Sequence, residues 1–200
     1  MKILICGDSF AADYTVKYSG KGWVNYIAEK NYVVNIAQAG CGEYKIYKQL
    51  YSQIKNLKNY DRLIISHTSP YRIHVENHPF YAEDLLHKNC DFIYNDVADK
   101  KEQCAELACV AEYFENFYNL EYAKFTHSLI CEKIETIVDT AGIQCLHIAN
   151  TEWNDLYNFK NMLNFYNHFL NYRGIVNHYS DEGNRIIFQD VLERLEKIDK

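Results

Sequence analysis

The 200-residue chain has only two prolines, at positions 70 and 79, and no apolar run long enough to cross a membrane. A membrane-spanning helix needs roughly 18 or more consecutive apolar residues, so no membrane contact is expected. Basic residues do not predominate, because 21 Lys and Arg accompany 27 Asp and Glu for a net charge of −6. Nucleic-acid binding relies on clustered positive charge, so nucleic acid is not an expected partner.

The seven cysteines are an odd number, and they are scattered from Cys6 to Cys145 without the spacing of a disulfide framework. They are typical of reduced thiols, which favours a cytoplasmic protein. The chain also lacks repeats and linkers, so we expect one domain spanning residues 1–200. Tyrosine is abundant, with 18 copies. Tyrosine-rich helices could line a substrate groove or the face of a homo-oligomer, and both alternatives stay open here.

Four apolar runs, at 3–6, 33–36, 63–66 and 143–148, alternate with segments that have helical spacing. This alternation predicts βαβ units and a parallel sheet. Three helical faces are expected, made by Trp23, Ile27 and Tyr26, by Ile46, Leu50, Ile54 and Leu57, and by Leu129, Ile130, Ile134, Ile137 and Val138. A last helix should begin after Ser180, whose hydroxyl can cap it, with Asp181 and Glu182 favouring its positive end.

Residues 70–101 interrupt this pattern, with both prolines and no sustained period, and are interpreted as an irregular insertion or lid. Residues 101–140 contain no Gly or Pro and predict one long helix, or two joined near 116–119. Several metal-ligating residue types occur in the insertion, but their spacing matches neither CxxC nor HExxH, so no metal site is predicted there. These residues are His74, His78, His87 and Cys90.

The first apolar run ends in Gly7-Asp8-Ser9. Parallel sheets keep their active sites just beyond the carboxyl ends of strands, where Ser9 should lie, although Asp8 or Ser9 could instead cap a following helix. The turns at 37–42 and 66–70 should emerge on the same edge, and His178 stands immediately before the last helix, where the chain returns to that edge. A serine and a histidine distant in sequence can therefore meet.

In this order, these features resemble the SGNH hydrolase family, also called GDSL esterases and lipases, over nearly the whole chain. The resemblance implies a three-layer α/β/α sandwich with a central parallel sheet, flavodoxin-like in topology. It implies that Ser9 is the nucleophile and that its backbone N–H helps to bind the oxyanion. Gly40 matches the glycine that donates a second N–H, and His178 matches the general base.

Two positions depart from the family pattern. The family carries Gly-x-Asn-Asp after the third strand, whereas residues 67–70 here are His-Thr-Ser-Pro, so Thr68 or Ser69 would have to donate in place of the oxyanion Asn. The family also has an acid three residues before the histidine, where this chain has Ile175. Two alternatives could orient His178 in its place. A backbone carbonyl could hold a Ser-His dyad, or the carboxylate of Asp155, Asp181 or Glu182 could approach the ring.

The resemblance implies a serine esterase that hydrolyses a small acyl ester, such as an O-acetyl group on a glycan, through an acyl-enzyme and without a metal or other cofactor. Asp8 and Arg72 are the candidates for substrate binding, since Arg72 can pair with a carboxylate or phosphate. A solvated Arg72 or a structural ion pair is the competing interpretation. An O-acyltransferase, or a non-catalytic carbohydrate- or protein-binding module on a degenerate hydrolase scaffold, are the alternative functions.

Overall fold

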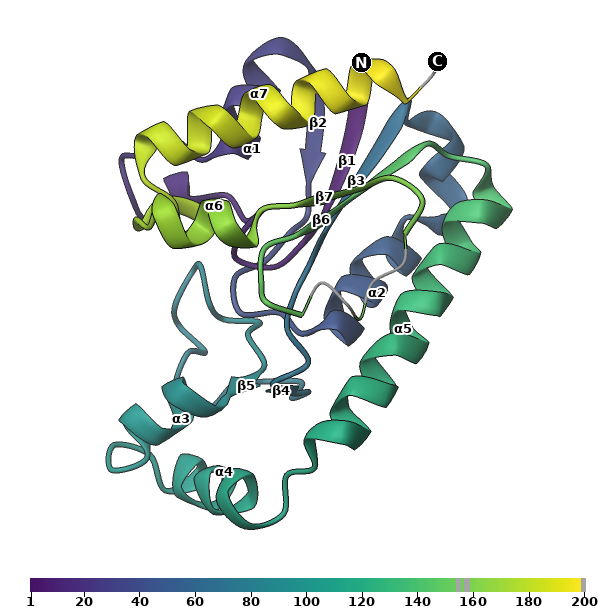
Figure 1. Ribbon diagram of the computed structural model, residues 1–200. Helices are drawn as coiled ribbons and strands as arrows, with labels where there is room; N and C mark the ends of the chain where they lie inside the picture. The colour runs from purple at the N-terminus through teal and green to yellow at the C-terminus, as the bar shows by residue number, and fades with distance from the viewer. Residues whose placement is uncertain (154–155, 157–158, 199–200) are drawn as a thin grey trace.

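A computed structural model describes residues 1–153, 156 and 159–198 of the chain. Five strands form the central sheet in the order β2-β1-β3-β6-β7, and every neighbouring pair is parallel (Figure 1). In this doubly wound order, β2 lies on one side of β1, and β3, β6 and β7 follow on the other side. The strands are β1 (Lys2–Gly7), β2 (Tyr32–Asn35), β3 (Arg62–His67), β6 (Cys145–Ala149) and β7 (Met162–Asn164).

Helices cover both faces of this sheet (Figure 1). Helices α1 (Trp23–Lys30) and α7 (Asp181–Lys197) pack on one face against Ile3 and Ile5 of β1. Helices α2 (Glu43–Ser52) and α5 (Leu120–Ala141) pack on the other. Successive side chains of a strand point to opposite faces, so the unbroken apolar run of β1 supplies both cores. The predicted three-layer α/β/α class with a central parallel sheet is confirmed.

The insertion contains more regular structure than its sequence predicts. Strands β4 (Arg72–Ile73) and β5 (Phe92–Ile93) form an antiparallel pair, followed by helix α3 (Tyr94–Lys100). Helix α4 (Ala105–Asn116) completes a small body beside the main sheet, with its own core around Val97 and Leu107 (Figure 1). Such short elements are too brief to establish a period in the sequence.

Other boundaries differ by small amounts. The segment 101–140 is two helices, as one of the alternatives had it, and the Asn119 side chain caps α5 by accepting from the Tyr122 amide. The helix through Ile46 ends at Ser52 and tightens into a 3₁₀ turn, Ile54–Asn59, which leaves Ile54 exposed. A short helix, α6 (Tyr166–Asn171), and the strand β7 were missed. Within the described residues, no helix combines the length and apolar character that crossing a bilayer requires.

The chain returns to the sheet edge through a 3₁₀ turn, Val176–His178, which hydrogen bonds connect to α1 and α7. Ser180 caps α7 as predicted, because its hydroxyl accepts from the Gly183 amide at 3.1 Å. Asn184, on the first turns of α7, accepts from the Trp23 amide at 3.0 Å and donates to the carbonyls of Val176, Tyr179 and Ser180. One buried amide side chain therefore joins α1, α7 and the turn that carries His178.

We expect Asn184→Ala to lower the free energy of unfolding by about 2–3 kcal/mol, since it takes the acceptor of the Trp23 amide and a donor to the Tyr179 carbonyl from a buried site. Asn116→Ala is the matched control, because its exposed side chain donates only to the Glu112 carbonyl within α4. That variant should change stability by no more than about 0.5 kcal/mol. Urea unfolding followed by circular dichroism measures both, and equal losses would contradict the role given to Asn184.

Candidate active site

The turn after β1 presents Ser9 at the carboxyl edge of the sheet. The Asp8 carboxylate accepts from the Phe10 amide at 3.0 Å, and the Asp8 carbonyl accepts from the Ala11 and Ala12 amides. These bonds close a single tight turn around Ser9, which is 6% exposed. Among the described residues, nothing accepts a hydrogen bond from the Ser9 amide. A backbone donor of this kind at a strand end can bind developing negative charge.

Gly40 lies in the turn after β2, beside the Ser9 turn. The Gln38 amide donates to the Gly7 carbonyl at 3.0 Å, which brings the two turns together. Gly40 has a φ of +76°, and a Cβ there would come within 2.3 Å of the Cys90 Cβ, so no other residue fits. In the described part of the chain, the Gly40 amide has no acceptor. The predicted oxyanion donors are therefore two unused amides on adjacent turns.

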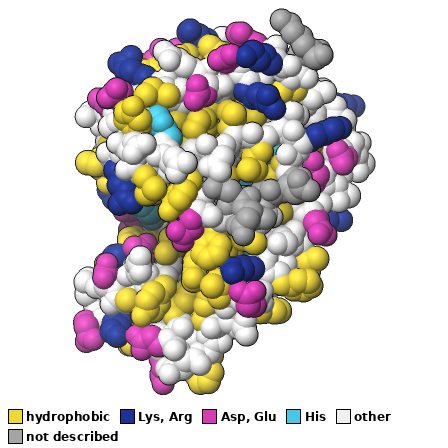
Figure 2. Space-filling view, in the orientation of Figure 1, with side chains coloured by type: hydrophobic (Ala, Val, Ile, Leu, Met, Phe, Trp, Pro, Cys, Tyr) yellow, Lys and Arg dark blue, Asp and Glu magenta, His cyan; other side chains and the backbone are white. Residues whose placement is uncertain are grey.

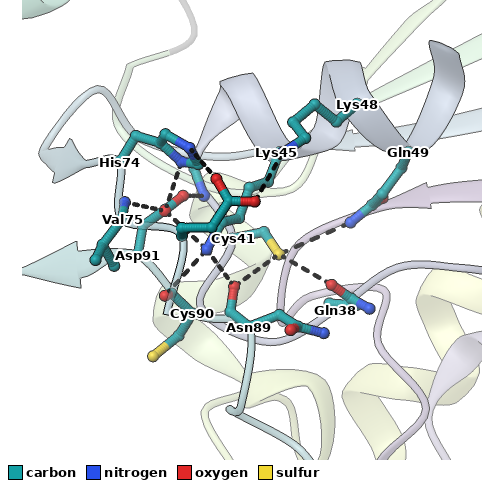
Figure 3. A network of polar contacts seen from close by, with 12 residues as sticks. Gln38, Cys41, Lys45, Lys48, Gln49, His74, Val75, Asn89, Cys90 and Asp91 are labelled. Carbon is teal, nitrogen blue, oxygen red and sulfur yellow. Dashed lines mark hydrogen bonds and ion pairs between the residues drawn. The ribbon is translucent and has the colours of Figure 1, made fainter. Parts of the chain in front are cut away.

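A polar network fixes the Gly40 turn to the insertion (Figure 3). The Gly42 amide donates to Asp91 at 2.7 Å, and the Lys45 ammonium contacts the other Asp91 oxygen at 3.0 Å. Lys45 also donates to the carbonyls of Asn89 and Cys90, while Asp91 accepts from His74. Buried charges are tolerated only when paired in this way. The insertion thus holds the Gly40 turn at the sheet edge.

Thr68 and Ser69, the two candidates for the third oxyanion donor, are placed differently. Thr68 is buried, its amide donates to the Glu43 carboxylate at 3.2 Å, and its hydroxyl lies near enough to Asp8 to lower the pKa of that carboxyl. Ser69 is partly exposed and lines two pockets at the surface. Thr68 therefore faces the interior of the protein, and Ser69 faces the space where a substrate can bind.

His178 lies next to the Ser9 turn. The Asn177 side chain donates to the carbonyls of Ser9 and Ala12, both at 2.9 Å, and so ties the two segments together. The His178 ring packs on Phe10, with ring centroids 4.7 Å apart, and against Tyr14 at 6.3 Å. No hydrogen bond between the Ser9 hydroxyl and the His178 ring occurs among the described residues. Burial lowers the pKa of His178 to about 4, aided by the positive charge of Arg72, so the ring is neutral at pH 7.

The residues considered as orienting acids lie elsewhere or outside the described residues. Ile175, three residues before His178, is 66% exposed. Asp181 and Glu182 occupy the first turn of α7, where they complement its positive end. Asp155 lies outside the described residues. Within the described part of the chain, no carboxylate raises the pKa of His178.

Asp8 and Arg72 form a buried ion pair behind Ser9, with the Arg72 Nη2 3.3 Å from the Asp8 Oδ2. Burial raises the pKa of Asp8 to about 6, and the Arg72 guanidinium, the Phe10 amide and the Thr68 hydroxyl oppose that rise. The other two nitrogens of Arg72, Nε and Nη1, are buried without hydrogen-bond partners among the described residues. Asp8 therefore has a structural role here, while Arg72 retains donors that an anionic group could use.

Two pockets share Ser69 as a lining residue. One, of about 270 Å³, lies between the insertion and α5 and is lined by Arg72 and by aromatic side chains that include Tyr113 and Tyr122. The other, of about 470 Å³, is lined by Tyr71, Trp153, Tyr166 and Phe169, among others. In the view of Figure 2, hydrophobic side chains gather in the lower half of the molecule. Phe169 contacts Phe10, with centroids 5.4 Å apart, so the second pocket adjoins the Ser9 turn.

A row of four titratable side chains behind Thr68 was not predicted from the sequence, and three of the four, Glu43, His67 and His147, are buried. Glu43 contacts His67 at 2.7 Å, His67 contacts His147 at 2.9 Å, and His147 contacts Glu135 at 3.2 Å. The signal available was polar residues at the ends of otherwise apolar runs, His67 after 63–66 and His147 within 143–148. In the insertion, His74 contacts Asp91, Glu76 and the Tyr44 ring. His78 accepts from the Phe80 amide and contacts the rings of Tyr81 and Phe92.

No protein-family model and no curated protein sequence matches the chain. Its structure is similar to the crystal structure of an acetyl xylan esterase, AlAXEase, with a TM-score of 0.54 and 14% sequence identity. The match covers 96% of this chain and 98% of the esterase chain. At this identity the likeness establishes a shared fold over essentially the whole length of both chains. The chemistry has to be argued from the residues themselves.

We expect Arg72→Met to destabilise the protein in a pH-dependent way. Asp8 binds its proton more tightly in the folded protein than in the unfolded chain, so charging it costs stability as the pH rises from about 4 through 6. Without Arg72 its pKa rises further. The variant should lose about 3–5 kcal/mol of unfolding free energy at pH 7.5 and clearly less at pH 5.

Urea unfolding at the two pH values measures this difference. The double variant Asp8→Asn, Arg72→Met is the control, because it removes the buried charge along with its partner, and it should show no such contrast between pH 5 and 7.5. A loss in Arg72→Met that is the same at both values would mean that the guanidinium acts through packing alone.

Proposed function

We propose that this protein is a serine ester hydrolase of the SGNH type, with Ser9 as nucleophile and His178 as general base. The observation that carries the proposal is the convergence of three turns at one edge of the sheet. The Ser9 turn and the Gly40 turn each contribute an amide without an acceptor in the described structure, and Asn177 binds the Ser9 turn directly. These are the parts that acyl transfer to a serine requires.

In the proposed reaction, Ser9 Oγ attacks the ester carbonyl carbon while His178 accepts the hydroxyl proton. The carbonyl oxygen becomes an oxyanion, which the amides of Ser9 and Gly40 stabilise, with Ser69 as a third donor. The imidazolium then returns the proton to the departing alkoxide oxygen, leaving an acyl-enzyme. A water molecule, deprotonated by His178, then attacks the acyl-enzyme ester. The tetrahedral intermediate collapses, the imidazolium returns the proton to Ser9 Oγ, and the acid is released.

This mechanism uses a dyad, because none of the described residues places a carboxylate where it orients the imidazole. Packing against Phe10 and Tyr14 restricts the ring instead, and burial keeps it neutral and able to accept a proton. The ring must turn from Phe10 toward Ser9 Oγ when substrate binds, since catalytic hydrogen bonds often tighten only in the complex. Removal of a triad carboxylate costs about 10⁴-fold in rate, so a modest turnover is expected.

We infer a small acyl group, such as acetyl, on a carbohydrate. The small exposed fraction of Ser9 favours a compact acyl group. The adjoining pocket offers the faces of Tyr71 and Trp153, and flat aromatic side chains suit the apolar faces of sugar rings. The similar structure is named as an acetyl xylan esterase, which agrees with this substrate class. Transfer of the acyl group to a sugar hydroxyl would proceed through the same acyl-enzyme.

A non-catalytic binding module is the second candidate, favoured by one observation. Among the described residues, Ser9 Oγ and the His178 ring share no hydrogen bond, and no carboxylate supports the ring. Such a module would bind an acetylated glycan without turning it over.

We expect Ser9→Ala to reduce the turnover of p-nitrophenyl acetate by at least about 10³-fold, because the variant lacks the oxygen atom that forms the acyl-enzyme. Ser52→Ala is the matched control, an exposed serine on α2, and should keep the parental rate. Equal rates in the parent and Ser9→Ala would remove Ser9 from the mechanism.

A fluorophosphonate probe tests the nucleophile independently of the natural ester. It should add one phosphonyl group per chain at Ser9, seen by mass spectrometry of the peptides, and none in Ser9→Ala. An unlabelled parent that binds acetylated xylan without hydrolysing it would support the binding module.

The pH dependence of the reaction should reflect the low pKa of His178. Because the ring accepts a proton from Ser9 only when neutral, kcat/KM should stay high down to about pH 5 and fall with a midpoint near 4. An ordinary histidine would give a midpoint near 6.5. Initial rates with p-nitrophenyl acetate between about pH 3 and 8 measure the curve, and a midpoint at 6.5 would show that His178 is not the base or is charged at rest.

A further inference from the structure

The row of Glu43, His67, His147 and Glu135 behind Thr68 has more contacts between hydrogen-bonding atoms than it has hydrogen atoms to place in them. Its three contacts, Glu43 with His67, His67 with His147, and His147 with Glu135, are 2.7, 2.9 and 3.2 Å long. Each contact joins two atoms that carry lone pairs, so each needs a proton or a cation between them. Two neutral imidazoles supply only two protons. The row therefore needs one further positive charge, although Glu43, His67 and His147 are buried and only Glu135 is partly exposed.

Two more ligand-type side chains converge on the Glu43 end of the row. The ligand atoms of Glu43, His67 and Cys131 all lie within 4.8 Å of one another, and all three residues are buried. His127, one helical turn before Cys131 on α5, has its Nε2 3.8 Å from the Glu43 Oε2. A carboxylate, two imidazoles and a thiol form a set that favours zinc among the common divalent cations.

We propose that Glu43, His67 and Cys131, with His127 as fourth ligand, bind a structural Zn²⁺ ion. Zinc takes the place of the missing proton between the Glu43 carboxylate and the His67 Nδ1. The His67 Nε2–H then donates to the His147 Nδ1, and the His147 Nε2–H donates to Glu135. Every contact in the row is satisfied, and a metal-bound histidine hydrogen-bonded through its other nitrogen is the usual arrangement.

The geometry requires only small movements. Tetrahedral zinc with ligands at roughly 2.0–2.3 Å needs donor atoms about 3.3 Å or more apart, so the 2.7 Å Glu43–His67 contact must open by about 0.6 Å. Binding also displaces the Cys131 thiol proton, and the Glu43 and Cys131 charges together balance the ion. Because Glu43 begins α2, His67 ends β3 and Cys131 lies in α5, the ion would join three elements.

The ion would also fix the loop that carries Ser69. The second oxygen of Glu43 accepts from the Thr68 amide at 3.2 Å, so the orientation of that carboxylate sets the path of the chain after β3. The zinc site is thus a positioning device behind the candidate active site. It does not depend on whether Ser9 is the nucleophile.

The test begins with the full-length protein, stripped with a chelator and titrated with Zn²⁺ by calorimetry. We expect one ion per chain and a thermal unfolding temperature raised by about 5 °C or more at a hundredfold excess over the dissociation constant. Mg²⁺ should do neither. With Co²⁺ as a spectroscopic probe, the parent should show thiolate-to-metal charge-transfer absorption. A parent protein that binds no Zn²⁺ and is not stabilised by it would overturn the proposal.

Variants then locate the ion. Cys131→Ser should weaken Zn²⁺ binding by about 100-fold or more and abolish the charge-transfer band, whereas Cys145→Ser, a buried cysteine outside the cluster, should leave both unchanged. Glu135→Gln, which acts through His147, should weaken binding by about tenfold with the stoichiometry kept. Cys109→Ser removes the exposed thiol, and loss of Zn²⁺ binding in that variant would reassign the ion to the surface and overturn the proposal.

Discussion

Two consecutive non-glycine residues, Asn177 and His178, adopt left-handed backbone conformations, with φ of 52° and 65°. Such residues cost of order 1 kcal/mol or more each and persist only where their surroundings hold them. Here the Asn177 side chain is committed to the Ser9 turn, and Asn184 holds the carbonyls of Val176 and Tyr179. A Cβ on Gly22 would overlap the Asn177 amide oxygen, so the start of α1 is shaped around the same side chain. The meeting of the two ends of the chain depends on these amides.

The sequence was sufficient to predict four of the five strands, because each contains a short apolar run, which is buried in β1, β3 and β6 and partly buried in β2 at the sheet edge. The fifth, β7, has only three residues and pairs at the sheet edge, where burial imposes no continuous pattern. The insertion was predicted as irregular for the same reason. At the candidate site, the sequence predicted which segments would share an edge. The sequence could not predict that Thr68 faces the interior, because this orientation depends on the buried Glu43 carboxylate, which accepts a hydrogen bond from the Thr68 amide.

The buried row of Glu43, His67, His147 and Glu135 could not be found from spacing, because its members come from α2, β3, β6 and α5. Each looks like an isolated polar residue near an apolar run. Only the parallel register that sets His67 beside Ala149 and His147 beside Ile65 brings the two histidines to adjacent strands. Titratable groups in a core are costly, so a row of four that includes close contacts implies a compensating charge.

The candidate active site and the buried row meet at Asp8 and Thr68. The Thr68 amide donates to Glu43, and its hydroxyl lies beside Asp8, where it opposes the rise in the pKa of Asp8 to which the negative charge of Glu43 adds. A cation beside Glu43 would offset that charge and lower the pKa of Asp8, which strengthens its pairing with Arg72 at neutral pH. The electrostatics behind Ser9 are therefore coupled to the buried row by the charge of Glu43, and Thr68 lies between the two carboxylates of Glu43 and Asp8.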